Sequence, residues 1–331
     1  MKFRFEFDIK KLPEPITHQH KLLLMGSCFT ENIGERLEKY KFTTLQNPNG
    51  ILFNPVSVAD AITAYVEAKR FSHDDLFHYN EGWHSWNHHS RFSGITSEEA
   101  LQKINSSVMT AHNFLKEADY VFITLGSSWV YTLTDKATKG KTGSVAANNH
   151  KAPADWFCKR LMSPEEVIQV LDKVIHSLFL FNSKIKIIFT ISPVRHLREG
   201  VVENNRSKAT LIHAVHHLAD KFDKLYYFPA YELVIDDLRD YRFYSEDLVH
   251  PNYFATQYVW EKLVGSCMDD KTRILMEEIH SINLAYQHKP FNSSSEQHKK
   301  FLQSHYQKVN ALYEAHQHLN FERELKYFSQ E

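Results

Sequence analysis

Short apolar runs alternate with longer amphipathic stretches along most of the chain. The apolar runs at 22–25, 120–125, 185–191 and 225–228 have the length and composition of buried β-strands. The amphipathic stretches predict α-helices at about 30–39, 54–70, 97–116, 163–180, 205–222 and 253–282. Alternating strands and helices are typical of βα units around a parallel sheet, so the pattern predicts an α/β fold.

Local signals mark where some of these elements begin and end. Asn54 before Pro55 predicts a helix start, because Asn accepts the first free N–H groups and Pro suits the first helical position. Ser163 with Glu166 three residues later forms a capping-box pattern. The sequence Asn47-Pro48-Asn49-Gly50 predicts a turn.

Three segments depart from this pattern. The stretches 71–94 and 134–157 lack a clear period and predict irregular insertions. From Ser293 onward, apolar residues recur at helical spacing, which predicts a long amphipathic helix packed on the body or on a second subunit. These residues are Leu302, Tyr306, Val309, Tyr313 and Leu319. We therefore expect a main domain at 1–292 and a C-terminal helical extension at 293–331, with homo-oligomer formation as one way to bury its apolar face.

Composition and charge argue against several classes of protein. With 39 Lys and Arg against 40 Asp and Glu, the chain lacks the excess positive charge of a nucleic-acid-binding surface. No stretch approaches the ~20 apolar residues of a membrane span, and the N-terminus, interrupted by Pro13 and Pro15, lacks a signal-peptide core. Three widely spaced cysteines suit a reducing compartment. We expect a cytoplasmic protein with no nucleic-acid or membrane partner.

A serine, an aspartate and a histidine are the candidates for catalysis. Ser27 follows the first predicted strand, where the N–H groups of the next helix stabilise a developing oxyanion. In Asp247-Leu248-Val249-His250, the three-residue separation lets the carboxylate reach Nδ1 of the imidazole. A nucleophile, a base and a group that orients the base are the parts of a serine hydrolase. The alternatives are that Ser27 only caps a helix and that Asp247 and His250 are ordinary loop residues.

Cys28 is a rival nucleophile beside Ser27. A thiolate is intrinsically the stronger nucleophile, and a helix N-terminus lowers its pKa. A free cysteine is more often a small buried apolar residue. We therefore expect Cys28 to be structural and to point into the core.

Further polar residues are candidates for shaping a pocket. Arg195 and His196 follow the most apolar predicted strand, where Arg195 is suited to hold a carboxylate or an acyl oxygen; the alternative is a polar turn. His84 and His88 are four residues apart, but their segment does not look helical and no Glu completes a zinc-protease pattern, so we expect no metal. Near them, Trp83, Trp86, His88 and His89 suit a wall for a sugar or acyl group, or simple packing.

Several blocks of the sequence resemble the GSCFA domain family. The blocks occur in the family's order and cover about 22–260. They are Gly26-Ser27-Cys28-Phe29-Thr30, Asn47-Pro48-Asn49-Gly50 with Phe53-Asn54-Pro55, Leu125-Gly126-Ser127-Ser128-Trp129-Val130-Tyr131, Ser192-Pro193-Val194-Arg195-His196, and Tyr241-Arg242-Phe243-Tyr244 leading to Asp247 and His250. This family is related to the SGNH (GDSL-type) hydrolases, which implies a flavodoxin-like three-layer α/β/α sandwich with a central parallel sheet and no cofactor.

The resemblance also implies residue roles. Ser27 matches the nucleophile, Asp247 the orienting acid and His250 the base. The superfamily's oxyanion hole uses the N–H of the nucleophile, a Gly for which Gly50 is the candidate, and an Asn after the third strand. This chain departs from the last feature, because Ser128 of Gly126-Ser127-Ser128 stands at the Asn position. Its hydroxyl, Asn87, Asn148 or a histidine are the candidate replacements, and Gly126 is a further candidate for the oxyanion or substrate site.

The expected function is that of a serine esterase that removes a small acyl group, such as acetyl, from a carbohydrate-like or small-molecule ester. One alternative is an acyltransferase with the same Ser-His-Asp site, in which Trp83 and Trp86 exclude water and seat an acceptor. Another is a non-catalytic binding module, which the missing Asn suggests.

Overall fold

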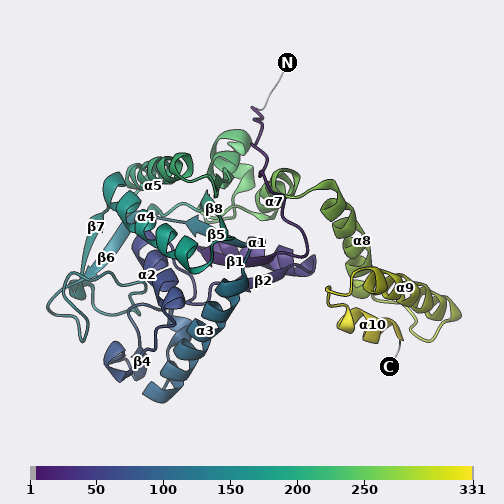
Figure 1. Cartoon of the computed structure of the whole chain (residues 1–331), viewed down its shortest axis with the longest axis horizontal. Coiled ribbons are helices and arrows are strands. Elements are labelled where there is room, and N and C mark those ends of the chain that lie inside the picture. The colour runs from purple at the N-terminus through teal and green to yellow at the C-terminus, as the bar shows by residue number, and fades with distance from the viewer. Residues whose placement is uncertain (1–4, 330–331) are drawn as a thin grey trace.

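Five parallel strands form the central sheet of the computed structural model, which describes residues 5–329. They are β1 (Lys21–Gly26), β2 (Thr43–Gln46), β5 (Tyr120–Leu125), β8 (Lys186–Ile191) and β9 (Leu225–Tyr227). Their order is β2-β1-β5-β8-β9 (Figure 1). This is the 2-1-3-4-5 order of flavodoxin-like proteins, so the expected α/β fold is confirmed.

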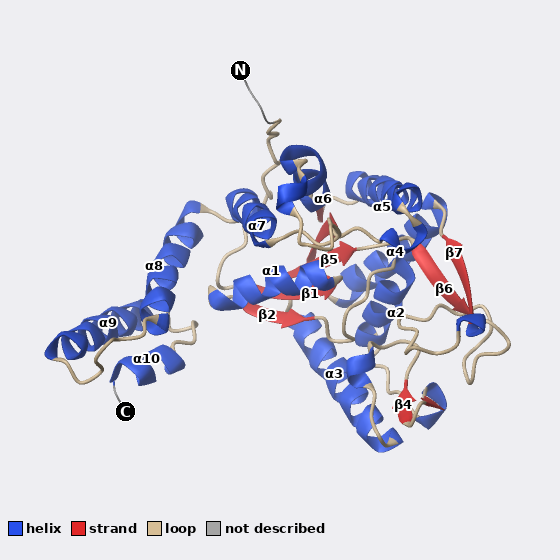
Figure 2. Cartoon of the chain, turned by 180° about the vertical axis from the view of Figure 1, so that it is seen from behind, coloured by secondary structure: helices blue, strands red, loops and turns tan. Residues whose placement is uncertain are grey.

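Helices cover both faces of the sheet and make three layers (Figure 2). One face packs against α2 (Pro55–Val66), α3 (Ser97–Glu117), α4 (Pro164–Phe181) and α5 (Val201–Lys221). The other packs against α1 (Cys28–Lys39), α6 (Ala230–Glu232) and α7 (Tyr253–Cys267). Side chains alternate across β1, because successive residues of a strand point to opposite faces: Leu23 and Met25 join the first core, and Leu22 and Leu24 join the second.

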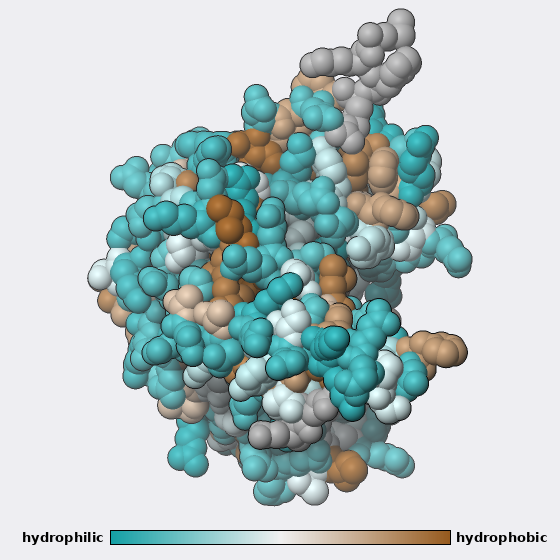
Figure 3. Space-filling model, turned by 90° about the vertical axis from the view of Figure 1, so that its right-hand side faces the viewer, coloured by the Kyte–Doolittle hydropathy of each residue, from teal (hydrophilic) through white to brown (hydrophobic). Residues whose placement is uncertain are grey.

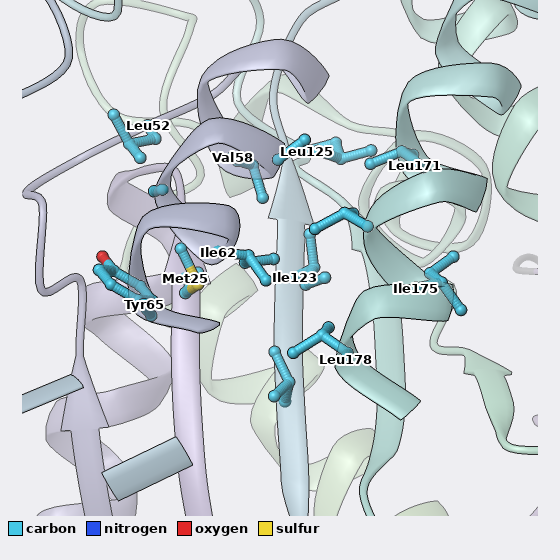
Figure 4. Close-up of a cluster of buried hydrophobic side chains, with 14 of the residues drawn as sticks. Met25, Leu52, Val58, Ile62, Tyr65, Ile123, Leu125, Leu171, Ile175 and Leu178 are labelled. Atoms are coloured by element: carbon cyan, nitrogen blue, oxygen red, sulfur yellow. The ribbon is translucent and has the colours of Figure 1, made fainter. Parts of the chain in front are cut away.

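The first core is shown in Figure 4, where β-strand, α2 and α4 side chains interlock. Met25, Ile123 and Leu125 from the strands meet Ile62 of α2 and Leu171 of α4. All five are at most 1% exposed. Because these side chains are buried and closely packed, the ends of the strands and the loops that follow them are held in fixed positions.

The predicted helix starts are confirmed. The Asn54 side chain accepts a hydrogen bond from the Ser57 N–H at 2.9 Å, with Pro55 at the first helical position. Ser163 and Glu166 form the reciprocal capping box of α4. These bonds satisfy N–H groups that have no partner within the helix.

The predicted helix at 253–282 is two helices, α7 and α8 (Asp270–Gln287). The break falls at Asp269, whose side chain caps α8 by accepting from the Thr272 N–H at 2.8 Å. The N-terminal segment that contains Leu12 and Ile16 binds to the end of α7, just before this break. The N–H of Leu12 donates to Ser266 O at 2.9 Å and that of Ile16 to Cys267 O at 2.7 Å.

Each insertion is associated with a short hairpin that hydrophobic periodicity did not predict, one within 71–94 and one whose strands flank 134–157. The segment 71–94 holds β3 (Phe77–Tyr79) and β4 (Gly82–His84). The segment 134–157 connects β6 (Trp129–Leu133) to β7 (Phe157–Leu161). Short helical turns occur at His73–Asp75, Ser90–Phe92, Ala154–Trp156, Leu197–Glu199, Leu233–Leu238 and Tyr241–Phe243.

The C-terminal tail was predicted as one long helix, which is wrong. It forms α9 (Glu296–Ala315) and α10 (Glu322–Ser329), and the buried Phe321 lies between them. Both helices share an apolar cluster with α8, which leads away from the sheet (Figures 1 and 2). Asn283 Nδ2 of α8 donates to Lys39 O at 2.7 Å, and Glu324 Oε1 of α10 pairs with Lys41 Nζ at 2.6 Å. These two contacts hold α8 and α10 against the end of α1.

The surface on the side of these helices is mostly hydrophilic, with scattered hydrophobic side chains (Figure 3). The predicted boundary at 292/293 and the expected oligomer stay predictions. Within residues 5–329, no helix combines the length and apolar character that crossing a bilayer requires.

Candidate active site

A cleft of about 630 Å³ opens where β1, β5 and β8 end. The loops after these three strands contribute Ser27, Ser127 and Arg195, and the loop before α7 contributes His250. The carboxyl edge of a parallel sheet is where proteins of this topology bind ligands.

The Ser27 side chain is available for chemistry. Ser27 occupies the N-cap position of α1, yet its side chain makes no capping bond. Its Oγ is buried and has no hydrogen-bond partner among the described residues, although Ser27 lines the cleft. Helix capping therefore does not explain this serine.

Gly26 makes the turn into Ser27 sterically feasible. Its φ is +137°, and a Cβ there would lie 2.2 Å from the Thr124 carbonyl oxygen of the neighbouring strand. Only glycine permits that approach. The glycine of the family signature thus allows the backbone to carry Ser27 from the strand into the cleft.

Asp247 and His250 form the pair that their spacing predicts. His250 Nδ1 lies 2.6 Å from Asp247 Oδ2. Asp247 Oδ1 accepts hydrogen bonds from the N–H groups of His250 at 3.0 Å and Val249 at 2.9 Å. The loop that makes these bonds has Leu248 in the left-handed conformation, with φ +58°. These hydrogen bonds, first those from the backbone, lower the pKa of Asp247 to about 2. The carboxylate is therefore ionised at neutral pH and fixes the imidazole.

Ser27 and His250 line the same cleft but do not hydrogen-bond to each other in this structure. Catalytic hydrogen bonds often tighten only when substrate binds. Because both residues line one cleft, a bound substrate could contact both of them.

Three expected oxyanion-hole residues have other partners. The Gly50 N–H closes the predicted turn by donating to Asn47 O at 2.7 Å. The Gly126 N–H donates to Phe53 O at 2.8 Å. Ser128 is fully buried, and its Oγ donates to Ser207 O of α5 at 3.1 Å. None of the three lines the cleft with a free donor, so the geometry does not support these assignments, which stay predictions.

The N–H of Ser27 is also engaged, since it donates to Thr124 O at 3.3 Å. The next N–H, that of Cys28, begins α1 and donates to no described backbone carbonyl. Asn148 lines the cleft too; its Oδ1 accepts from the His150 N–H at 2.8 Å, which leaves its amide nitrogen as a donor. Cys28 N–H and Asn148 Nδ2 are the better candidates for oxyanion donors.

Cys28 was expected to point into the core, which is wrong. It is exposed and lines the cleft. Desolvation by the surrounding protein nevertheless raises the pKa of its thiol and outweighs the N–H groups of α1. Because the thiolate is the nucleophile, a raised pKa disfavours Cys28 in that role.

His196 lies against the floor of the cleft beside Gly126. A Cβ at Gly126 would be 3.2 Å from His196 Nε2, which is buried and has no hydrogen-bond partner among the described residues. Burial, together with Lys208 and His250, lowers the pKa of His196 to about 4. His196 is thus neutral at pH 7, and it contributes to the shape of the cleft and supplies Nε2 as an unpaired nitrogen.

The histidine- and tryptophan-rich insertion contributes only His89 to the cleft lining. His88 is buried, bonded through Nδ1 to Ser85 Oγ at 2.9 Å, and its pKa is lowered by burial to about 3. Trp83 packs against His73, and Trp86 stacks on Phe77 with ring centroids 3.7 Å apart. These contacts favour the simple-packing alternative for Trp83, Trp86 and His88, and their role in a sugar-binding wall stays a prediction. Within residues 5–329, no three potential metal ligands converge.

Sequence reasoning missed Lys208 beneath the site. This lysine is 1% exposed, and its Nζ donates to Gly126 O and Ser192 O, both at 2.7 Å. It therefore ties together the loops that follow β5 and β8. Burial lowers the pKa of Lys208 to about 7. The sequence did contain a sign of this role, because Lys208 lies on the same helix face as Leu211 and Val215. A lysine on a buried face needs hydrogen-bond or charged partners.

Trp129, Tyr131 and Lys159 of the β6–β7 hairpin also line the cleft. Lys159 Nζ lies 4.7 Å from the Trp129 ring centroid and 5.3 Å from that of Tyr131. The residues that supply an aromatic wall therefore come from this hairpin and not from the segment 71–94.

Fold and cleft together define a doubly wound α/β protein with a ligand site at the carboxyl edge of its sheet. Residues 21–263 match the model of the GSCFA family, and residues 279–331 match that of the GSCFA domain protein, C-terminal domain. The chain belongs to the GSCFA family. A comparison with curated proteins finds no match.

Two solved structures show only distant similarity. A carbohydrate esterase family 3 from Talaromyces cellulolyticus has a TM-score of 0.35 and 8% identity, covering 78% of this chain and 99% of that one. A GDP-L-fucose synthetase from Naegleria fowleri has a TM-score of 0.21 and 11% identity, covering 89% and 99%. Both scores are too low to support an argument about function.

Proposed function

We propose that the protein is a serine esterase of the SGNH type that removes a small acyl group, such as acetyl, from a carbohydrate-like or small-molecule ester. One observation carries the proposal: an unbonded Ser27 hydroxyl at a helix N-terminus shares a cleft with a hydrogen-bonded Asp247–His250 pair. These are the nucleophile, base and orienting group that acyl transfer through a serine requires.

In the proposed reaction, Ser27 Oγ attacks the ester carbonyl and its proton passes to His250 Nε2. Asp247 accepts a hydrogen bond from Nδ1–H, which leaves Nε2 unprotonated and able to act as the base. The tetrahedral intermediate collapses as His250 protonates the leaving alkoxide, and water then hydrolyses the acyl-enzyme by the same route. The N–H of Cys28, the residue after the nucleophile, is in the position that commonly stabilises the oxyanion. No step needs a cofactor.

The acyltransferase alternative relied on Trp83 and Trp86 to exclude water. Both pack within the insertion, outside the cleft lining, so nothing specific now favours transfer over hydrolysis. Comparing products with and without an added alcohol acceptor distinguishes the two.

A fluorophosphonate probe tests the proposal, because it reacts with activated serines. We expect one adduct by intact mass on the wild-type protein and none on Ser27→Ala or His250→Ala. Cys28→Ala is the matched control and should retain the adduct, since the neighbouring thiol has no role in the reaction. A folded wild-type protein without an adduct would contradict the hydrolase and favour a binding module. An adduct that survives in Ser27→Ala would contradict the role of Ser27 as the nucleophile.

A further inference from the structure

The wall of the cleft beside His250 carries an excess of positive charge. Among the residues that line it, Lys159, Arg195 and Arg198 are cationic, and Glu199 alone is anionic. The balance of the whole chain is close to neutral. The positive charge is therefore a local property of this cleft.

Only one of these three cations is neutralised by a carboxylate. Lys159 forms an ion pair with Glu199. Neither Arg195 nor Arg198 pairs with any carboxylate of the described residues; Arg198 Nη1 donates to Tyr131 Oη at 3.4 Å. Two guanidinium groups thus remain available to a ligand.

Arg195 is held close to the proposed base. Its backbone N–H donates to Val249 O at 3.2 Å, one residue before His250, and its guanidinium carbon lies 5.1 Å from the centroid of the Tyr244 ring. A guanidinium presents paired N–H donors that match the two oxygens of a carboxylate or phosphate. The cation–π contact with Tyr244 holds this guanidinium beside the loop that carries His250.

We propose that the substrate is an anionic ester whose carboxylate or phosphate group binds Arg195 and Arg198. This inference rests on the proposed esterase function. The aromatic rings of Trp129 and Tyr131 line the same cleft and suit an apolar ring face of the substrate. An acylated sugar acid and an acylated sugar phosphate both have the required chemistry.

The test uses three acetyl esters of one sugar: a neutral glucoside, the corresponding glucuronate and the glucose 6-phosphate. The readout is the ratio of kcat/KM for each anionic ester to that for the neutral one. We expect a ratio of about 10–100 in the wild-type protein, through KM, because a hydrogen bond to a charged group contributes about 1.5–3 kcal/mol. Arg195→Met should lower the ratio, because only Arg198 then remains to bind the anion, and Arg195→Lys should leave a value between those of Arg195→Met and the wild type. The better of the two anionic esters identifies carboxylate or phosphate.

Arg206→Met is the matched control, because Arg206 is an exposed arginine that pairs with Glu203 and does not line the cleft. It removes the same charge and should keep the wild-type ratio. A wild-type ratio near one, or a ratio that Arg195→Met leaves unchanged, overturns the inference while the hydrolase stands.

Binding to Ser27→Ala, measured by calorimetry with the intact esters, separates the two proposals. If no ester is hydrolysed, binding of only the anionic esters upholds the substrate class and rejects the hydrolase. Equal binding of the anionic and neutral esters overturns the substrate class.

Discussion

Replacement of Asp247 by asparagine is expected to lower kcat for hydrolysis of a small acetyl ester about 10⁴-fold, the loss typical of a triad aspartate. In the native pair, Oδ1 accepts two backbone N–H groups and Oδ2 accepts from His250 Nδ1. An asparagine amide keeps the backbone bonds with its oxygen and turns its NH₂ toward Nδ1. Nδ1 must then be the acceptor, so the ring proton moves to Nε2, where it prevents the imidazole from accepting the serine proton.

Steady-state kinetics on Asp247→Asn would measure this loss, with KM and thermal stability expected near those of the wild type. Glu246→Gln is the matched control, because it neutralises the adjacent carboxylate and should retain wild-type kcat. A kcat for Asp247→Asn within tenfold of wild type would show that Asp247 does not orient the base.

Replacement of Lys208 by methionine is expected to lower the free energy of unfolding by about 2–4 kcal/mol at pH 9. The Lys208 amine donates to two buried carbonyl oxygens, those of Gly126 and Ser192. Methionine has a similar length but no N–H, so both oxygens lose their donor, and each unsatisfied buried acceptor costs about 1–3 kcal/mol. The loops after β5 and β8 would lose the contact that joins them.

The effect of Lys208→Met should also depend on pH. Burial lowers the pKa of Lys208 from 10.5 to about 7 in the folded protein. Between these values the unfolded chain binds more protons, so the stability of the wild-type protein rises with pH by up to about 1.4 kcal/mol per unit. Methionine has no such dependence, and the difference in stability should widen by about 2 kcal/mol from pH 7 to pH 9.

Urea unfolding of both proteins at pH 7, 8 and 9 measures this difference. Lys221→Met, at the exposed end of the same helix, controls for loss of a surface lysine and should show no widening. A constant difference across this range would mean that Lys208 keeps its proton in the folded state.

Features encoded by neighbouring residues could be predicted from the sequence. The strand at 120–125 was predicted within its bounds, because a buried parallel strand is a continuous apolar run. The Asp247–His250 contact was predicted because three residues of chain fix its geometry. The edge strand β2, Thr43–Gln46, was missed because three of its four residues are polar and an edge strand buries little.

Features that depend on distant residues could not be predicted. Whether the Ser128 hydroxyl faces the cleft depends on its acceptor Ser207, which belongs to a helix far along the chain. Sequence position identified the right loops but not the direction of their N–H and O–H groups. Lys208 was missed for the same reason, since its partners are carbonyl oxygens that any residue would supply.

The backbone bonds of Leu12 and Ile16 to Ser266 and Cys267 have a consequence for biosynthesis. Their partners are made roughly 250 residues later, which corresponds to about 12–50 s of translation at about 5–20 residues per second. Throughout that time these two N–H groups lack their native acceptors, and Ser27 has been synthesised without His250. A ribosome-bound chain therefore carries the proposed nucleophile but not the proposed base, and the complete cleft forms only when most of the protein has emerged.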